Sequence, residues 1–246
     1  MKLTFLGTNG WFDSGTGNTP SAVLETANHN IIFDAGFGLA KAGDCLNPDK
    51  PTFLFLSHFH IDHICGLHAL PALNFKQPLT IFGRKDIKKL FKTVINSPYS
   101  APLSFLNYKV NLVPLKEGNY KQPFEFSCKQ LKHTDSALGY RLRVDGKTIV
   151  YCSDTAICEN DRLLARDADL LIHECAFVPG ETSDWGHSNP EEVAAMAKQA
   201  NVKRLALTHF GAARYNSLAV RRNAEAVAKA IFPDTVAATD GLVIQI

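Results

Sequence analysis

Residues 53–63, FLFLSHFHIDH, constrain this chain more than any other stretch. The first four are apolar and predict a buried strand, and three histidines and one aspartate follow within six positions. Side chains two apart on an extended segment lie on the same side, so His58 and His60 can share one metal ion while Asp62 and His63, beyond a bend, reach a second. Imidazole and carboxylate ligands suit Zn²⁺ best, and also Mn²⁺ or Fe²⁺. The spacing favours a metal site over four polar residues of an ordinary surface loop.

The composition is that of an ordinary globular protein without a strong charge bias. Of the 246 residues, 46% are hydrophobic and 20% are charged, which is enough apolar material for a substantial core. Twenty-six basic and twenty-four acidic residues leave a net charge of +2, which argues against a surface built mainly to hold a polyanion. Composition alone therefore does not indicate nucleic acid, although a local basic patch stays open.

Cysteine usage and apolar runs predict the compartment. The six cysteines include no C-x-x-C pair and several lie in apolar runs, which is typical of free thiols in a reducing compartment. The N-terminus has no long apolar segment of the secretory kind, and no apolar run approaches the roughly 18 residues that a membrane helix needs. We therefore expect a cytoplasmic protein that does not associate with membranes.

Short apolar runs bounded by turn residues predict a chain rich in strands. The first three runs predict an antiparallel meander, and Asp145-Gly146 predicts a tight hairpin later in the chain. Besides the run at 53–56, the predicted strands are 3–6, 22–25, 31–33, 79–82, 109–114, 124–132, 138–144, 148–152, 170–173, 204–208 and 241–246.

Four segments predict helices of some length. Asn189, Pro190 and Glu192 supply the N-cap, the first-position proline and the N3 glutamate of a helix over 190–200. Residues 84–94 place apolar side chains on one face and lysines on the other. We interpret that basic face as the solvated side of the helix, with contact to a phosphate backbone as the alternative. The remaining predicted helices are 64–73 and 217–231, and 97–108 predict a turn-rich loop that could lie near the site.

No low-complexity linker and no run of like charge divides the chain. Strand runs, with helices after the first third and again near the end, favour two sheets packed face to face with helices outside. We therefore predict an α/β fold in which residues 1–246 form a single four-layer domain.

Three further polar residues, His133, Asp154 and His209, each stand where a predicted buried strand ends. Taken singly, each is more often a hydrogen-bonded loop residue than a ligand. Together with the four polar residues of 53–63 they complete seven candidate ligands. These are three histidines for one ion and three further ligands for a second, with Asp154 able to bridge the two. Asp34 also follows a predicted strand, and we interpret it either as the hydrogen-bonding partner of a ligand histidine or as a plain turn residue.

The motif H58-F-H60-I-D62-H63, followed in order by His133, Asp154 and His209, resembles the metallo-β-lactamase fold superfamily over nearly the whole chain. The resemblance implies a four-layer αββα sandwich of two mixed β-sheets flanked by helices, with two metal ions at one edge. It implies that His58, His60 and His133 hold the first ion, that Asp62, His63 and His209 hold the second, and that Asp154 bridges them.

Within the superfamily, four segments resemble the ribonuclease Z and small phosphodiesterase branch: KHTDSALGYR at 132–141, LIHECAF at 171–177, WGHS at 185–188 and LTHFGAARY at 207–215. The resemblance implies that Glu174 pairs with His187 and that His187 protonates the leaving oxygen. The residue types agree, because a neighbouring carboxylate holds a histidine charged near neutral pH. The alternative for His187 is a histidine satisfied within a loop.

The chain departs from ribonuclease Z in two respects. Those enzymes commonly carry an arm, inserted after the third metal histidine, that grips tRNA, whereas here only a hairpin separates residues 139–141 from Asp154. Their N-terminal loop presents basic residues, whereas residues 4–40 contain no Lys or Arg. We therefore expect a phosphodiesterase that hydrolyses a small or cyclic nucleotide-like diester through a metal-bridging hydroxide, which Asp62 would ligate and orient. Two divalent ions, Zn²⁺ before Mn²⁺ or Fe²⁺, are the expected cofactors.

Three other functions stay open. One is tRNA 3′-processing by an endonuclease whose arm is lost or supplied by a partner, and another is a lactonase or thioesterase on the same fold, which the pairing of Glu174 with His187 disfavours. The third is a metal-bound binding protein without turnover, which the complete ligand set disfavours. The expected partners are a small phosphodiester substrate and a second copy of the chain in a homodimer, while nucleic acid stays open but is not favoured.

Overall fold

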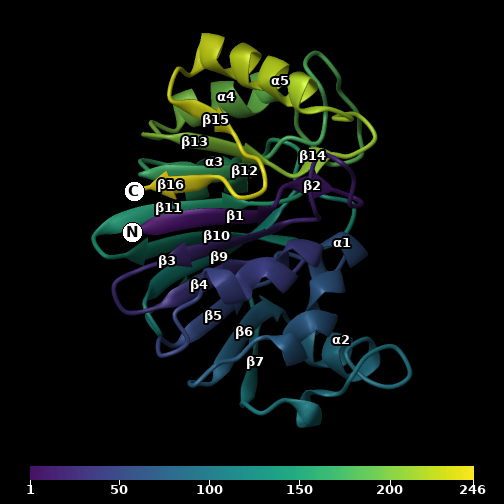
Figure 1. The fold of residues 1–246 in the computed structure, drawn as a ribbon. Coiled ribbons are helices and arrows are strands. Elements are labelled where there is room, and N and C mark those ends of the chain that lie inside the picture. The colour runs from purple at the N-terminus through teal and green to yellow at the C-terminus, as the bar shows by residue number, and fades with distance from the viewer.

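A computed structural model describes all residues from 1 to 246 and contains two seven-stranded sheets (Figure 1). The first sheet has the strand order β16 (Val243–Gln245), β1 (Lys2–Gly7), β3 (Ser21–Glu25), β4 (Asn30–Phe33), β5 (Thr52–Phe55), β6 (Leu79–Arg84) and β7 (Val110–Leu115). The second has the order β15 (Thr235–Ala237), β13 (Leu205–Thr208), β12 (Leu170–Glu174), β11 (Lys147–Cys152), β10 (Ala137–Val144), β9 (Glu125–Leu131) and β8 (Gly118–Tyr120). A two-stranded pair joins β2 (Asn9–Gly10) to β14 (Phe210–Gly211).

Both large sheets are mixed, and they are built alike. In the first sheet the pairs from β16 to β4 are antiparallel and those from β4 to β7 are parallel. In the second sheet the pairs from β8 to β11 are antiparallel and those from β11 to β15 are parallel. Because the carboxyl ends of parallel strands meet at one edge of a sheet, residues that follow β4, β5, β11, β12 and β13 are brought close together.

The helices cover the outer faces of both sheets. They are η1 (Phe37–Asp44), α1 (Ile61–Ile64), η2 (Cys65–Ala72), α2 (Ile87–Thr93), η3 (Leu103–Phe105), α3 (Glu159–Ala165), α4 (Pro190–Gln199) and α5 (Leu218–Ile231), where η marks a 3-10 helix. One apolar core packs η1, η2 and α2 on the first sheet, and another packs α3, α4 and α5 on the second. Figure 1 shows α4 and α5 beyond β13 and β15 at one end of the molecule and α2 near β6 and β7 at the other.

The third core lies between the two sheets and is rich in aromatic rings. Phe33 and Phe55 from the first sheet meet Phe126, Tyr140 and Tyr151 from the second, and all five side chains are buried. Burial of a side chain of this size contributes roughly 1.5–3 kcal/mol. Two sheets with helices outside both confirm the predicted four-layer αββα sandwich, while its organisation as a single domain stays a prediction.

The predicted strands are all present, with ends within two residues of those expected, and the hairpin is confirmed. Asp145 and Gly146 both have positive φ, 48° and 74°, which is the backbone of the tight turn that this pair favours. The capping residues of α4 are confirmed as well, because Asn189 and Glu192 each accept the other's backbone N–H. The structure adds β2, β8, β14, β15 and α3, which were not predicted.

Two helix predictions need correction. The helix predicted over 64–73 is a short α1 followed by the 3-10 helix η2, which contains Pro71, a residue that cannot donate a backbone hydrogen bond. The helix predicted from residue 84 begins at Ile87, because β6 extends through Arg84. The apolar residues of α2 are buried as predicted and its lysines are exposed. None of the helices is both long and apolar enough to cross a membrane.

Candidate metal centre

The chemistry-bearing residues lie where strands of both sheets end. His58 comes three residues after β5, His133 follows β9, Asp154 follows β11 and His209 follows β13. His60 caps the N-terminus of α1, a short helix that contributes Asp62 and His63. The predicted metal residues are therefore brought together by the sheet edge, although up to 151 positions of sequence, from 58 to 209, separate them.

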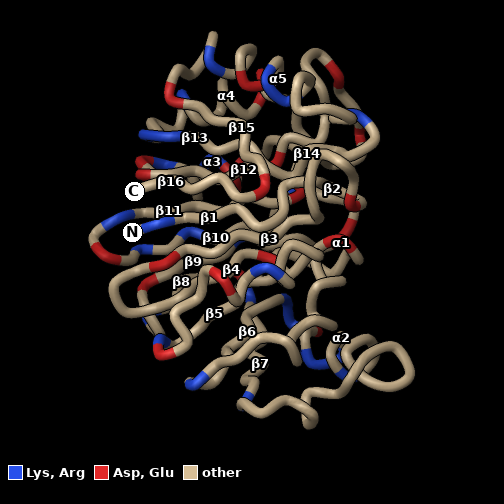
Figure 2. Tube along the Cα trace, viewed as in Figure 1, with Lys and Arg blue, Asp and Glu red and all other residues tan.

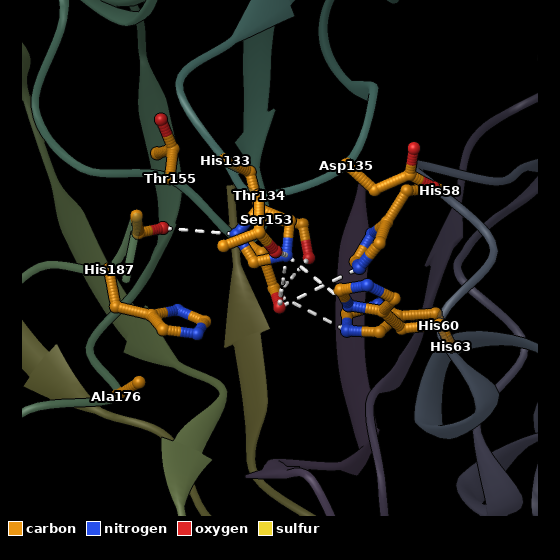
Figure 3. Close-up of polar contacts among 12 residues, drawn as sticks. His58, His60, His63, His133, Thr134, Asp135, Ser153, Thr155, Ala176 and His187 are labelled. Carbon is orange, nitrogen blue, oxygen red and sulfur yellow. Dashed lines mark hydrogen bonds and ion pairs between the residues drawn. The ribbon is translucent and has the colours of Figure 1, made fainter. Parts of the chain in front are cut away.

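The seven residues form two clusters, and Asp154, which belongs to the first, also lies close to two histidines of the second. In the first, one atom each of His58, His60, His133 and Asp154 lies within 4.8 Å of the others. In the second, Asp62, His63 and His209 meet the same criterion. Figure 3 shows His58, His60, His63 and His133 pointing toward a common centre, with His187 approaching from the other side.

Asp154 lies between the clusters and turns one carboxylate oxygen toward each. Its Oδ1 is 3.2 Å from His63 Nε2 and 3.1 Å from His209 Nε2. Its Oδ2 is 3.7 Å from both His58 Nε2 and His133 Nε2. A carboxylate in this position could contact two ions at once, so the bridging role that the resemblance implies for Asp154 is compatible with these distances and stays a prediction.

The separations within the clusters fit a metal ion better than direct hydrogen bonds. With Zn–N bonds of about 2.0–2.1 Å, the edge of a tetrahedron of ligand atoms measures about 3.3 Å. His63 Nε2 lies 3.1 Å from His209 Nε2 and 3.4 Å from Asp62 Oδ2, and His133 Nε2 lies 3.2 Å from His60 Nδ1. His58 Nε2 is buried and has no hydrogen-bond partner, which is costly unless another group binds it. The residues present therefore fit a pair of divalent ions.

The electrostatics of the clusters also favour cations. Burial, followed by the charge of neighbouring histidines, lowers the pKa of His58, so its ring is neutral and free to bind a metal. Burial alone would also lower the pKa of His63, but Asp154, Asp62 and Asp34 raise it well above its ordinary value. Burial would raise the pKa of Asp62, yet His63 and His209 hold it well below its usual range. The second cluster thus stabilises positive charge at the point where an ion would sit.

Asp34 is the hydrogen-bonding partner of His63, a predicted metal residue, and not a plain turn residue. Its Oδ2 lies 2.8 Å from His63 Nδ1 and accepts hydrogen bonds from the hydroxyls of Ser57 and Tyr151, both at 2.7 Å. Its Oδ1 accepts the backbone N–H of Ser57 at 2.6 Å. The carboxylate is fully buried, so it holds the His63 ring with Nε2 directed at the second cluster.

We expect Asp34→Asn to weaken metal binding at the second cluster by about 10- to 100-fold, because the amide cannot orient and polarise His63 as the carboxylate does. Competition with a chromophoric chelator would measure the affinity of each site. Asp49→Asn is the matched control, since Asp49 is exposed and pairs only with Lys76. Equal affinities for the Asp34 variant and the control would contradict the orienting role.

Glu174 and His187 form the second predicted pair, and the structure brings them into contact. Glu174 Oε1 lies 2.8 Å from His187 Nδ1, and Glu174 is fully buried. The same carboxylate accepts the backbone N–H groups of Thr155, Ala176 and Ser188, which keep it in place. Burial would lower the pKa of His187, but the charge and hydrogen bond of Glu174 outweigh it and raise that pKa to about 9. His187 is therefore charged at neutral pH.

A pocket of about 470 Å³ opens over both clusters and His187. Its wall includes Trp11, which the sequence analysis did not single out, and Phe177, Trp185 and Arg214, which lie in the quoted motifs but were given no role there. None of its lining residues comes from the loop 97–108, whose position relative to the site the sequence had left open. Trp11 gave no sequence signal of its own, since an isolated tryptophan in a loop has no characteristic spacing.

The comparison with family models and known sequences agrees with this geometry. A family model described as "Beta-lactamase superfamily domain" matches residues 29–210, well over half of the chain. A protein named ribonuclease Z from Bacillus licheniformis is 29% identical over 304 aligned positions, which cover 98% of this chain and 97% of that protein. At least 58 of these positions, the difference between 304 and 246, have no residue in this chain.

Two solved structures share the whole fold. The metallo-beta-lactamase fold protein YhfI from Bacillus subtilis superposes with a TM-score of 0.81 at 23% identity, covering 99% of each chain. The short form of human tRNase Z superposes with a TM-score of 0.79 at 24% identity, covering 100% of this chain and 99% of the other. At these identities the likeness concerns the fold alone.

Proposed function

The chain belongs to the beta-lactamase superfamily and is a metal-dependent hydrolase, and from this premise we propose that it hydrolyses phosphodiester bonds. The observation that carries the proposal is the contact of His187 Nδ1 with the buried carboxylate of Glu174, at 2.8 Å, at the edge of two metal-type clusters. An acid at this point suits an alkoxide leaving group of phosphorus, which needs a proton as it departs. A lactonase or thioesterase would need only the metal ions to polarise its carbonyl group. The additional pair of Glu174 and His187 therefore disfavours that alternative.

His58, His60 and His133 would hold one ion, Asp62, His63 and His209 the other, and Asp154 would contact both. Two bound divalent ions would supply Lewis acidity toward the phosphate oxygens and make a water acidic enough to attack at neutral pH. Histidine and carboxylate ligands suit Zn²⁺ best, with Mn²⁺ and Fe²⁺ as alternatives.

The side chains around the clusters would donate a proton, orient the attacking water and bind the phosphate. His187 has Nδ1 committed to Glu174, so Nε2 is the atom that would give its proton to the leaving oxygen. Asp62 would accept a hydrogen bond from the attacking water and so orient it, and its own Oδ2 is kept in place by the backbone N–H of Trp11 at 2.8 Å. Arg214, which lines the pocket and pairs with Glu181, would place positive charge near the phosphate.

Among substrates, the comparisons support RNA before a small diester, which reverses the order expected from the sequence. The sequence relatives that align over nearly the whole chain are named ribonuclease Z, as is the Bacillus licheniformis protein. We therefore propose endonucleolytic cleavage of RNA, as in tRNA 3′-processing, as the first candidate reaction. The exposed lysines of α2 are a surface that RNA could contact, because α2 lies close to the pocket. It begins three residues after Arg84, and Arg84 Nη1 donates a hydrogen bond to Asp135, the neighbour of the pocket residue Thr134.

A small or cyclic nucleotide-like diester stays the second candidate because of one observation. The 20 residues that lead from His133 to Asp154 contain β10, β11, the two-residue turn between them and four flanking residues, so nothing projects from this hairpin to hold a large substrate. The aligned relative contains at least 58 positions that this chain lacks. Without such an insertion the pocket itself would provide most of the substrate contacts.

The two candidates are separated by one pair of assays and one variant. We expect metal-refilled protein to release p-nitrophenolate from bis(p-nitrophenyl) phosphate and, for the RNA candidate, to cleave precursor tRNA. Lys88→Glu with Lys89→Glu should then raise KM for precursor tRNA by about 10-fold or more at low salt, since counterion release by lysines contributes much of RNA affinity. The same variant should not change the rate on the small diester.

The matched control for this variant is Lys198→Glu with Arg222→Glu. It makes the same change of net charge on exposed residues of α4 and α5, at the other end of the molecule (Figure 2). Diester hydrolysis without any tRNA cleavage would select the small-diester candidate. Cleavage of a homoserine lactone or a thioester, with no diester turnover in either Zn²⁺ or Mn²⁺, would overturn the proposed function.

A further inference from the structure

Both tryptophans of the chain lie exposed on the wall of the pocket. Trp11 is 70% exposed and Trp185 is 72% exposed, and the sequence contains no other tryptophan. Large aromatic side chains are mostly buried in folded proteins, where they stabilise the core. Other aromatic rings of the chain are equally exposed, such as Phe105 at 77%, but the two indoles both line the pocket over the metal-type clusters, where a bound ligand could cover them.

The backbone of Trp11 is held in a conformation that bulky residues rarely adopt. Its φ is 77°, in the left-handed region, and its N–H donates to Asp62 Oδ2. The preceding Gly10 packs directly on His209, and a Cβ there would lie 2.5 Å from the ring atom Cε1. Asn9 ties the loop down through hydrogen bonds to Ser14 and to the carbonyl of Gly17. The strain and the anchoring fix Trp11 relative to the metal cluster.

Trp185 is attached to the other functional segment of the pocket. It lies two residues before His187, and the neighbouring Gly186 carbonyl is 3.2 Å from His133 Nδ1. The indole is therefore placed by the same short segment that places the proposed acid. One tryptophan is thus tied to Asp62 on one segment of the chain and the other to His187 on another.

We infer that Trp11 and Trp185 form a stacking subsite for the nucleobases of a nucleotide diester. This inference rests on the proposed function, because it needs a phosphodiester at the metal centre. Stacking suits the site because every base presents a flat π-face, whereas the polar residues Thr134, Asp184 and Arg214 on the same wall offer hydrogen bonds to sugar and base edges. Single-stranded RNA and a small nucleotide diester share this chemistry.

The kinetic test compares two esters with the same leaving group, thymidine 5′-(p-nitrophenyl phosphate) and methyl p-nitrophenyl phosphate. We expect the wild-type protein to prefer the nucleoside ester, and Trp185→Ala to lower the ratio of the two kcat/KM values by about 10- to 100-fold. Trp185→Phe should restore most of the ratio, since phenylalanine also stacks. Phe105→Ala, which removes an aromatic ring that is 77% exposed but lies outside the pocket, is the control. An unchanged ratio in Trp185→Ala would overturn the inference.

A second measurement needs no turnover. Trp11→Phe and Trp185→Phe each leave one tryptophan, so the fluorescence of each variant reports on a single indole. We expect thymidine 5′-monophosphate to quench both saturably, and ribose 5-phosphate, which lacks a base, to quench neither. Quenching of Trp185 alone by the mononucleotide but of both indoles by a short RNA would indicate that the subsite spans neighbouring bases of RNA.

The two measurements keep this inference and the proposed function apart. If the protein hydrolyses neither ester with Zn²⁺ or Mn²⁺, the proposed function fails, and the quenching still decides whether the indoles bind a base. If both esters are hydrolysed but thymidine 5′-monophosphate quenches neither indole, the stacking subsite is wrong and the proposed function stands. A quench that depends on protein concentration rather than on nucleotide would show that a second copy of the chain covers the indoles, which also overturns the inference.

Discussion

His187→Ala is expected to slow hydrolysis of a diester with a poor leaving group by about 10²- to 10⁴-fold, while the bound metal stays unchanged. The reason is that His187 lies beside the clusters and has its Nδ1 engaged by Glu174, so we expect its loss to remove a proton donor and to leave the proposed metal ligands in place. An ester of p-nitrophenol should be slowed much less, because p-nitrophenolate leaves without a proton. The measurements are kcat on both kinds of ester and metal content by elemental analysis.

Glu174→Gln gives a second test of the acid role of His187, through the pH dependence of the rate. Burial lowers the pKa of His187 and Glu174 raises it, so removing the carboxylate should lower that pKa from about 9. An acid must be protonated to act, so activity is lost as the pH rises through its pKa, and in Glu174→Gln this alkaline loss should move to lower pH. Equal slowing of good and poor leaving groups by His187→Ala would show that His187 is not the acid.

Asp154→Ala is expected to remove both metal ions and to reduce diester hydrolysis to the background rate. Asp154 is the one carboxylate that turns an oxygen toward each cluster, with Oδ1 at 3.1 Å from His209 and Oδ2 at 3.7 Å from His58. Its negative charge is held by these histidines, which lower its pKa although burial would raise it. Without Asp154, the first cluster would contain no anionic ligand. No negative charge of Asp154 would then offset the repulsion between the two cations.

Metal content per chain and the rate of diester hydrolysis check this prediction. Asp234→Ala is the control, because Asp234 is exposed and does not line the pocket. Asp154→Asn keeps the shape of the side chain and removes only its charge, so it should also lose metal. Retention of two ions and of more than about a tenth of the activity in Asp154→Ala would contradict the bridging role.

The strands were predictable because their signal is local. A buried strand reads as a short apolar run between turn residues, and the runs at 53–56, 148–152 and 204–208 became β5, β11 and β13 with small shifts of their ends. The 3-10 helix η2 was not distinguished from an α-helix because its apolar spacing over 64–73 fits both. The strand β15 was missed because its three residues carry too little pattern to recognise.

The sequence by itself determined the kind of site, since closely spaced histidines and an aspartate at 58–63 are typical of metal ligands and the remaining ligands follow apolar strands. Only the tertiary structure brings these residues together, because the carboxyl ends of strands from two sheets must meet before Asp154 can turn one oxygen toward each cluster. It also decided that Asp34 bonds His63 and that Trp11 donates to Asp62. Such contacts join residues 29 and 51 positions apart, and no local pattern records a distance across the sheet edge.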